Sequence, residues 1–156
     1  MIALRWIIAV AATALVMPAH AATSDPETII YRVTGVVDNG GASGTGFATV
    51  FNCTNLSPVV ESIRFVVRNF NSVIAANAAF SVGSLQTVSV STHFTVLFAG
   101  FTLSPGTSLK GTTVMAATST NIFCSAMIVD AGAATASAIA ATLPMVRFSP
   151  MAGTEE

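Results

Sequence analysis

Residues 46–54, Gly-Phe-Ala-Thr-Val-Phe-Asn-Cys-Thr, alternate between two sets of side chains. Phe47, Thr49, Phe51 and Cys53 point to one side of an extended chain, and the residues between them point to the other. An apolar side that returns at every second residue predicts a β-strand with one buried face. Cys53 is therefore expected in the interior, beside two phenylalanines.

Segments with the same two-residue period follow one another along most of the chain, separated by turns that contain Gly, Asn, Pro or Ser. No stretch has the period of a helix, and Ala-rich residues 131–143 are expected to form an ordered loop because Gly132 and two threonines weaken a helix there. About seven to nine short strands predict an all-β fold, an antiparallel immunoglobulin-like β-sandwich with one disulfide. The expected strands span residues 28–37, 46–54, 62–70, 73–82, 86–92, 94–98, 112–118, 121–130 and 145–148.

Residues 1–21 have the features of a secretory signal peptide. Arg5 supplies the positive charge at the start, and residues 6–17 form an uncharged run that is too short to cross a membrane. Ala19-His20-Ala21 offers the small residues that a signal peptidase recognises, so we predict cleavage after this triplet. Export of residues 22–156 as a single β-sandwich domain is expected, with the periplasm, the cell surface and the medium all open as destinations.

Cys53 and Cys124 are the only cysteines in the chain. In an exported protein an even pair indicates one disulfide. A bridge between an early and a late strand is similar to the immunoglobulin plan, in which the bridge joins facing sheets. The other marks of that family are missing, because the one Trp is Trp6 and Ile122 stands where a Tyr would be expected. The similarity therefore supports the architecture and not membership of the family.

No anchor or membrane span is expected. The predicted leader has no cysteine to receive a lipid, residues 151–156 are polar, and no later apolar run reaches about 18 residues. After residue 21 the chain has five basic and seven acidic residues, a formal net charge of −2. This balance argues against nucleic acid and against an anionic membrane surface as partners.

His93 is the only histidine after the predicted leader. One histidine and two distant cysteines give no spacing typical of a metal site, so neither a metal nor a cofactor is expected. A small secreted hydrolase that uses His93 with Asp38 or Asp130 is an alternative interpretation. A catalytic triad needs a serine, a histidine and a carboxylate. Any serine-rich chain with one histidine contains these residue types, so no catalytic residue is assigned.

Arg64 and Arg68 lie four residues apart on one expected strand. Their side chains therefore share a face at a separation of roughly 13 Å. Two fixed guanidinium groups can hold an anionic partner, which makes this pair a candidate anion-binding site. The alternative is a solvated sheet face, or charges that discourage strands from pairing edge to edge.

The scarcity of converging titratable groups favours a non-enzymatic exported module, structural or binding, that acts at the cell envelope or in the extracellular space. Its partner is expected to be an unidentified protein or glycan. Besides the hydrolase, a further alternative is a subunit of an extracellular assembly that is joined by β-strand addition at an open sheet edge.

Overall fold

The computed structural model describes residues 27–40, 44–106 and 109–148, and the expected signal peptide lies outside these ranges. Within them the chain is built of strands, and the one helical segment is a single 3-10 turn, η1 (Ala136–Ala138). The predicted all-β fold is confirmed. The strands are β1 (Thr28–Asp38), β2 (Phe47–Asn55), β3 (Glu61–Asn69), β4 (Ile74–Val82), β5 (Thr87–Ser91), β6 (Phe101–Thr102), β7 (Leu109–Ala117), β8 (Ile122–Asp130), β9 (Ile139–Thr142) and β10 (Met145–Arg147).

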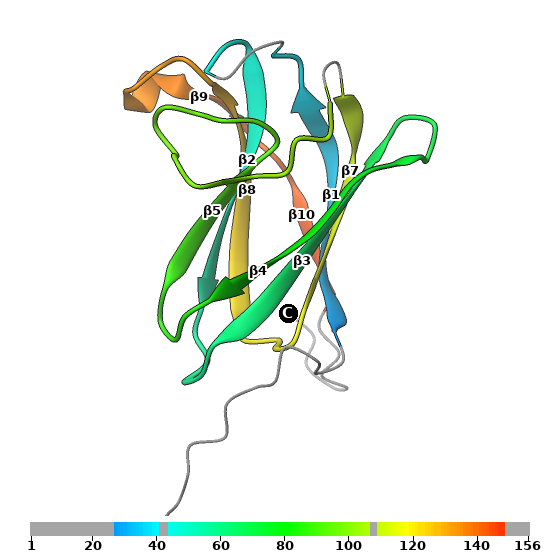
Figure 1. Ribbon diagram of the computed structural model, residues 1–156, viewed down its shortest axis with the longest axis vertical. Coiled ribbons are helices and arrows are strands. Elements are labelled where there is room, and N and C mark those ends of the chain that lie inside the picture. The colour runs from blue at the N-terminus through cyan, green and yellow to red at the C-terminus, as the bar shows by residue number, and fades with distance from the viewer. Residues whose placement is uncertain (1–26, 41–43, 107–108, 149–156) are drawn as a thin grey trace, which may run out of the picture.

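The strands form one curled, mixed sheet, a half-barrel (Figure 1). Pairing divides this sheet into two halves, with strand orders β4-β3-β7-β1-β10 and β9-β8-β2-β5-β6. Every pair is antiparallel except β5 with β6, which is parallel. The sheet is therefore not the purely antiparallel one that the sequence predicted.

A single main core lies between the halves and receives side chains from both. The strict alternation of β3 turns Ile63, Phe65 and Val67 into it. Phe65 meets Phe51 of β2 with ring centroids 5.5 Å apart. Each fully buried side chain of this size contributes about 1.5–3 kcal/mol of transfer free energy. The largest fully buried side chains are Phe51, Phe65, Ile30, Ile63, Met115 and Ile122.

The two halves are joined at a corner where β1 leaves β2. Asp38 and Ala48 are the only register pair of these strands. Just before it, the Thr49 hydroxyl accepts a hydrogen bond from the Val37 N–H at 2.8 Å and donates one to the Val37 carbonyl at 3.0 Å. The Thr92 hydroxyl donates to the same carbonyl and accepts from the Thr49 N–H. Two threonine side chains thus replace ladder hydrogen bonds and let the sheet turn.

The predicted disulfide between Cys53 and Cys124 is confirmed. The two cysteines are register partners on the adjacent strands β2 and β8, with their Cα atoms 4.1 Å apart. An immunoglobulin bridge joins facing sheets instead. The Tyr31 hydroxyl of β1 accepts a hydrogen bond from the Cys124 N–H at 3.4 Å, which ties the other half to this position.

Residues 94–98 are not a strand, contrary to the prediction. They form an irregular segment whose Val96 N–H donates to the carbonyl of Ala131. The physical reason is that β2 is buried on both faces. Its outer face needs a cover, and Phe98 packs there on a second, smaller cluster. That cluster consists of Ala48, Val50, Val129 and Ala131.

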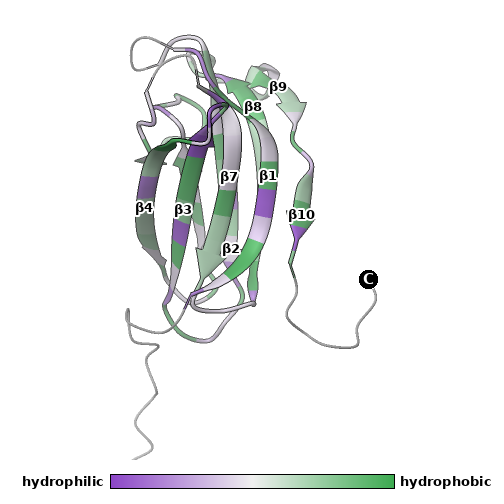
Figure 2. Cartoon of the chain, turned by 90° about the vertical axis from the view of Figure 1, so that its right-hand side faces the viewer, coloured by the Kyte–Doolittle hydropathy of each residue, from purple (hydrophilic) through white to green (hydrophobic). Residues whose placement is uncertain are grey.

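Residues 131–143, expected as a loop, contain η1 and then β9. β9 pairs with β8, and β10 pairs with β1, with Pro144 between them (Figure 2). This strap covers one side of the half-barrel. Arg147 fixes its end, since the guanidinium lies 4.1 Å from the centroid of the Phe123 ring and donates to the Thr120 carbonyl at 2.9 Å.

Replacing both cysteines, Cys53→Ala with Cys124→Ala, should lower the free energy of unfolding. The bridge spans 71 positions, and a loop of that length stabilises a chain by about 4 kcal/mol in the chain-entropy model. Urea unfolding with and without reductant measures the effect. An unchanged midpoint for the reduced wild type would contradict the stabilising role.

Thr49→Val should destabilise the fold by about 1–3 kcal/mol, because it leaves the partly buried N–H of Val37 without its partner while keeping the side-chain shape. Thr34→Val is the matched control, since Thr34 is exposed on the same strand as Val37. Chemical unfolding of both variants checks this. Equal stabilities would mean that the corner does not depend on the hydroxyl.

Candidate functional site

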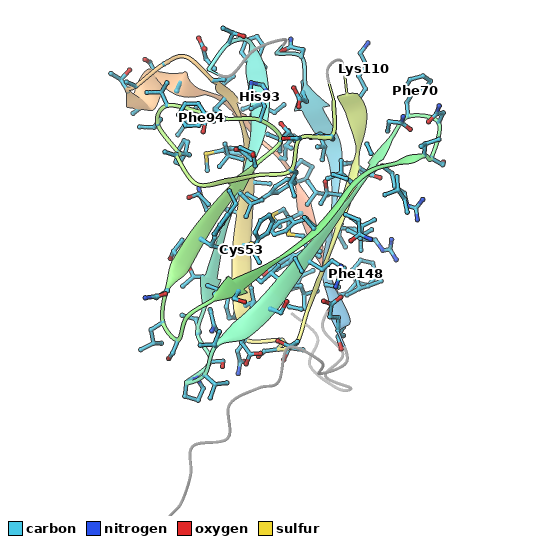
Figure 3. The ribbon with its side chains drawn as sticks, viewed as in Figure 1. Cys53, Phe70, His93, Phe94, Lys110 and Phe148 are labelled. Atoms are coloured by element: carbon cyan, nitrogen blue, oxygen red, sulfur yellow. A yellow bond between two sulfur atoms is a disulfide. The ribbon has the colours of Figure 1, made fainter. Side chains whose placement is uncertain are left out.

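Two features at one end of the molecule are candidates for a functional site. The first is the pair formed by His93 and Asp38. The Nδ1 atom of His93 lies 2.7 Å from Oδ1 of Asp38, a carboxyl that is only 2% exposed at the end of β1. Nε2 lies 2.9 Å from the carbonyl oxygen of Thr45, across the β1–β2 connection. Figure 3 shows His93 at the end of the half-barrel that also carries Lys110.

These contacts assign a proton to Nε2 of His93. A carbonyl oxygen only accepts hydrogen bonds, so Nε2 must be the donor to Thr45. A general base needs a free lone pair within reach of its substrate, and neither ring nitrogen offers one in this arrangement. Gly40 packs against the ring so closely that an added Cβ would lie 2.6 Å from Nε2. His93 therefore links β1 to the turn that follows it, through hydrogen bonds to Asp38 and Thr45.

Burial raises the pKa of Asp38 above its ordinary value of 3.8. The charge of His93, the hydrogen bond from its ring and a backbone hydrogen bond from Gly40 act in the opposite direction, but desolvation is the larger effect. A buried carboxyl that lies within hydrogen-bond distance of an imidazole nitrogen fits a structural pair.

The second feature is an open pocket of about 730 Å³ formed by β1, β7 and the β3–β4 turn. Gly111 allows β3 and β7 to lie close together beside it, because an added Cβ there would collide with the carbonyl oxygen of Arg68. Arg68 and Lys110 line it, together with Phe70, which is 82% exposed. Figure 3 shows Phe70 on the β3–β4 turn and Lys110 at the start of β7, both near the same end of the molecule.

Strand register explains why cations gather here. Arg68 pairs with Thr112, and Lys110 comes two residues earlier on β7, so these side chains share the outer face of the sheet. Val114 pairs with Arg32 of β1, which places that arginine on the same face. We call this surface the basic face; its cations are Arg32, Arg64, Arg68 and Lys110. They are four of the five cations that follow residue 21.

The cations of the basic face differ in their partners. Arg64 forms an ion pair with Glu27 at 2.7 Å and donates to Asn77 Oδ1 at 3.1 Å. Arg68 donates only to the Ser72 carbonyl, and no described residue forms an ion pair with Arg68 or Lys110. The pocket therefore presents two positive charges that form no ion pair with the part of the chain that the structure describes.

The sequence paired Arg64 with Arg68, and the structure places both on one face of β3 but gives them different surroundings. Arg68 lines the pocket, whereas Arg64 is neutralised by Glu27. Sequence reasoning missed Lys110 and Phe70. The available signal for Phe70 was a large aromatic residue inside a polar turn, Asn69–Ser72.

The described residues contain no cluster of three or more His, Cys, Asp or Glu side chains that could hold a metal ion, and none of their helices is long and apolar enough to cross a membrane. No protein-family model matches the chain, and searches of curated proteins and of solved structures find no match either. The argument about function therefore depends on the chemistry of the site alone.

Asp38→Asn should remove a pH dependence of stability. The folded pKa of Asp38 lies above the unfolded value of 3.8. Between these values the native state binds more protons than the unfolded chain, so stability is fully present below the unfolded pKa and is lost as pH rises through the folded pKa. Relative to the variant, the free energy of unfolding of the wild type should fall as pH rises.

Urea unfolding of both proteins at pH values from about 3 to about 7 measures this difference. Asp130→Asn is the control, because the Asp130 side chain is exposed. A wild-type advantage over Asp38→Asn that grows with pH would reverse the sign and contradict the assignment.

Proposed function

We propose that this chain is an exported, non-enzymatic binding module whose pocket on the basic face holds an anionic partner at the cell envelope or in the extracellular space. The single observation that supports it is the pocket lined by Arg68 and Lys110, since no described acid neutralises either cation. The sheet fixes the backbone of both residues, so an anion has to order only their side chains.

The other groups of the pocket favour a carboxylate-bearing glycan as the partner. The guanidinium of Arg68 matches the planar geometry of a carboxylate. The exposed ring of Phe70 is available to pack on the apolar face of a sugar ring. Neutral hydrogen-bonding groups surround these residues, and they suit sugar hydroxyls; they are Asn39, Asn69, Ser72 and Thr112.

Export and scaffold belong to the same proposal. The signal-peptide features of residues 1–21 and the disulfide between Cys53 and Cys124 support an oxidising destination. We infer an immunoglobulin-like sandwich plan for the scaffold, because two facing halves enclose one core. The scaffold departs from that plan in the bridge between neighbouring strands and in the parallel pairing of β5 with β6.

Replacing the two pocket cations, Arg68→Gln with Lys110→Gln, should weaken binding of polygalacturonate oligomers. A hydrogen bond to a charged group contributes about 1.5–3 kcal/mol, so each lost contact should raise the dissociation constant by about tenfold to a hundredfold. Arg64→Gln is the matched control, because it removes a cation of the same face that Glu27 already neutralises. Calorimetric titration at low and high salt measures the affinities.

Fully methyl-esterified oligomers test the role of charge, and they should bind weakly if at all. Equal binding of the esterified and free forms would contradict an anionic site. Preferential binding of polyglutamate over the uronate would replace the glycan with an acidic protein as the partner. Absence of binding to either anion at low salt would overturn the proposal.

A further inference from the structure

The basic face carries a second pair of a cation and an exposed ring, outside the pocket. Arg32 on β1 is exposed, and its Cζ atom lies 5.2 Å from the centroid of the Phe148 ring. Phe148 directly follows β10 and is 43% exposed. The pair repeats the combination found in the pocket, where two cations and the exposed ring of Phe70 line one cavity. We call Arg32 and Phe148 the second subsite.

Strand register gives the position of the second subsite relative to the pocket. Arg68 of β3 and Thr34 of β1 both lie opposite Thr112 of β7. Arg32 comes two residues before Thr34, so its side chain emerges on the same face of the sheet. Two strand spacings and one two-residue step therefore separate the Cβ atoms of Arg32 and Arg68 by about 12 Å. Figure 2 shows β3, β7 and β1 side by side, with hydrophilic bands on β3 and β1.

The strip of surface between the pocket and the second subsite is uncharged. Thr112 and Thr34 are exposed on it, and Val66 and Val114 are half-buried. The threonine hydroxyls can donate and accept hydrogen bonds, and the valines offer apolar area. A chain of sugar rings needs both kinds of contact, so this strip suits the part of a glycan that lies between two anionic groups.

The cations of both subsites lack acidic partners among the described residues. No ion pair of the described chain involves Arg32, Arg68 or Lys110. One acid of the described chain is paired with Arg64, two are buried, and one ends β8 in the other half of the sheet; in this order they are Glu27, Asp38, Glu61 and Asp130. Three cations on one face therefore remain available to a ligand that carries several negative charges.

We propose that the basic face binds a linear uronate-bearing polysaccharide across both subsites, with one sugar acid in the pocket and another between Arg32 and its surroundings at Phe148. This inference rests on the proposed function, because the pocket is its first subsite. The separation of the subsites exceeds the length of one sugar ring, so only a chain of several sugars reaches both. Binding at the first subsite then holds the chain near the second at a high effective concentration.

Galacturonate oligomers of increasing length test the second subsite, with NMR titration for the shortest and calorimetry for the longer ones. The monomer occupies one subsite at a time, so its binding to the pocket should be equal in the wild type and in Arg32→Gln. Long oligomers should bind Arg32→Gln about tenfold more weakly than the wild type, because a contact with a charged group is lost. Arg64→Gln is the matched control, because Glu27 already neutralises that cation of the same face.

Oligomer length also has a statistical effect on affinity. A long oligomer offers many positions at which a single subsite can bind, and this raises the apparent affinity without a second contact. The statistical gain persists in Arg32→Gln, so the comparison of this variant with the wild type separates it from the second subsite.

The ring of the second subsite has its own test. Phe148→Leu removes the aromatic face, keeps an apolar side chain, and should weaken the binding of long oligomers about threefold. Phe123→Leu is the matched control. Phe123 is 44% exposed and also lies beside a guanidinium, but it belongs to β8 in the other half of the sheet.

The outcomes separate this inference from the proposed function. Equal binding of long oligomers by the wild type and Arg32→Gln would overturn the second subsite and leave the pocket as the site. Losses of the same size in Arg64→Gln or Phe123→Leu would also contradict it. No binding of any uronate would overturn both proposals. Circular dichroism checks that the variants fold, which is expected because Arg32 and Phe148 are exposed.

Discussion

The hydrogen bonds that Thr49 makes to both backbone groups of Val37 are the constraint on which the arrangement of this protein depends. A sheet can turn sharply between two strands only if the backbone groups that leave the ladder find other partners. Thr49 and Thr92 supply those partners, and the buried pair of Asp38 and His93 closes the same corner. The two halves can then face each other over one core, and the basic face is turned outward.

This corner also explains why some polar side chains serve the fold while others stay available on the surface. The titratable side chains nearest the corner already have partners within the fold, because both ring nitrogens of His93 and the Asp38 carboxyl are hydrogen-bonded. A buried polar group left without a partner would cost about 1–3 kcal/mol, so these contacts are needed by the fold before they can serve chemistry. Arg68 and Lys110 stand outside the corner and are not used in this way.

The local parts of the fold could be predicted from sequence, and the long-range parts could not. Alternation of side chains correctly predicts that Cys53 is buried and that Arg64 and Arg68 share a face. Period alone gives no register between strands, so it could not place Cys124 beside Cys53 on an adjacent strand, nor Lys110 beside Arg68. The wrong prediction of a strand at residues 94–98 has a similar origin. A short apolar run predicts a strand both where it pairs with another strand and where it only packs over one.

The basic face and the neutral β4 edge are linked consequences of a low charge content. The sequence is only 8% charged, and four cations are concentrated on the outer face of β1, β3 and β7. Few charges are then left to guard the strands beside that face, and β4 has none. An uncharged edge strand beside a charged face is therefore a consequence of this composition.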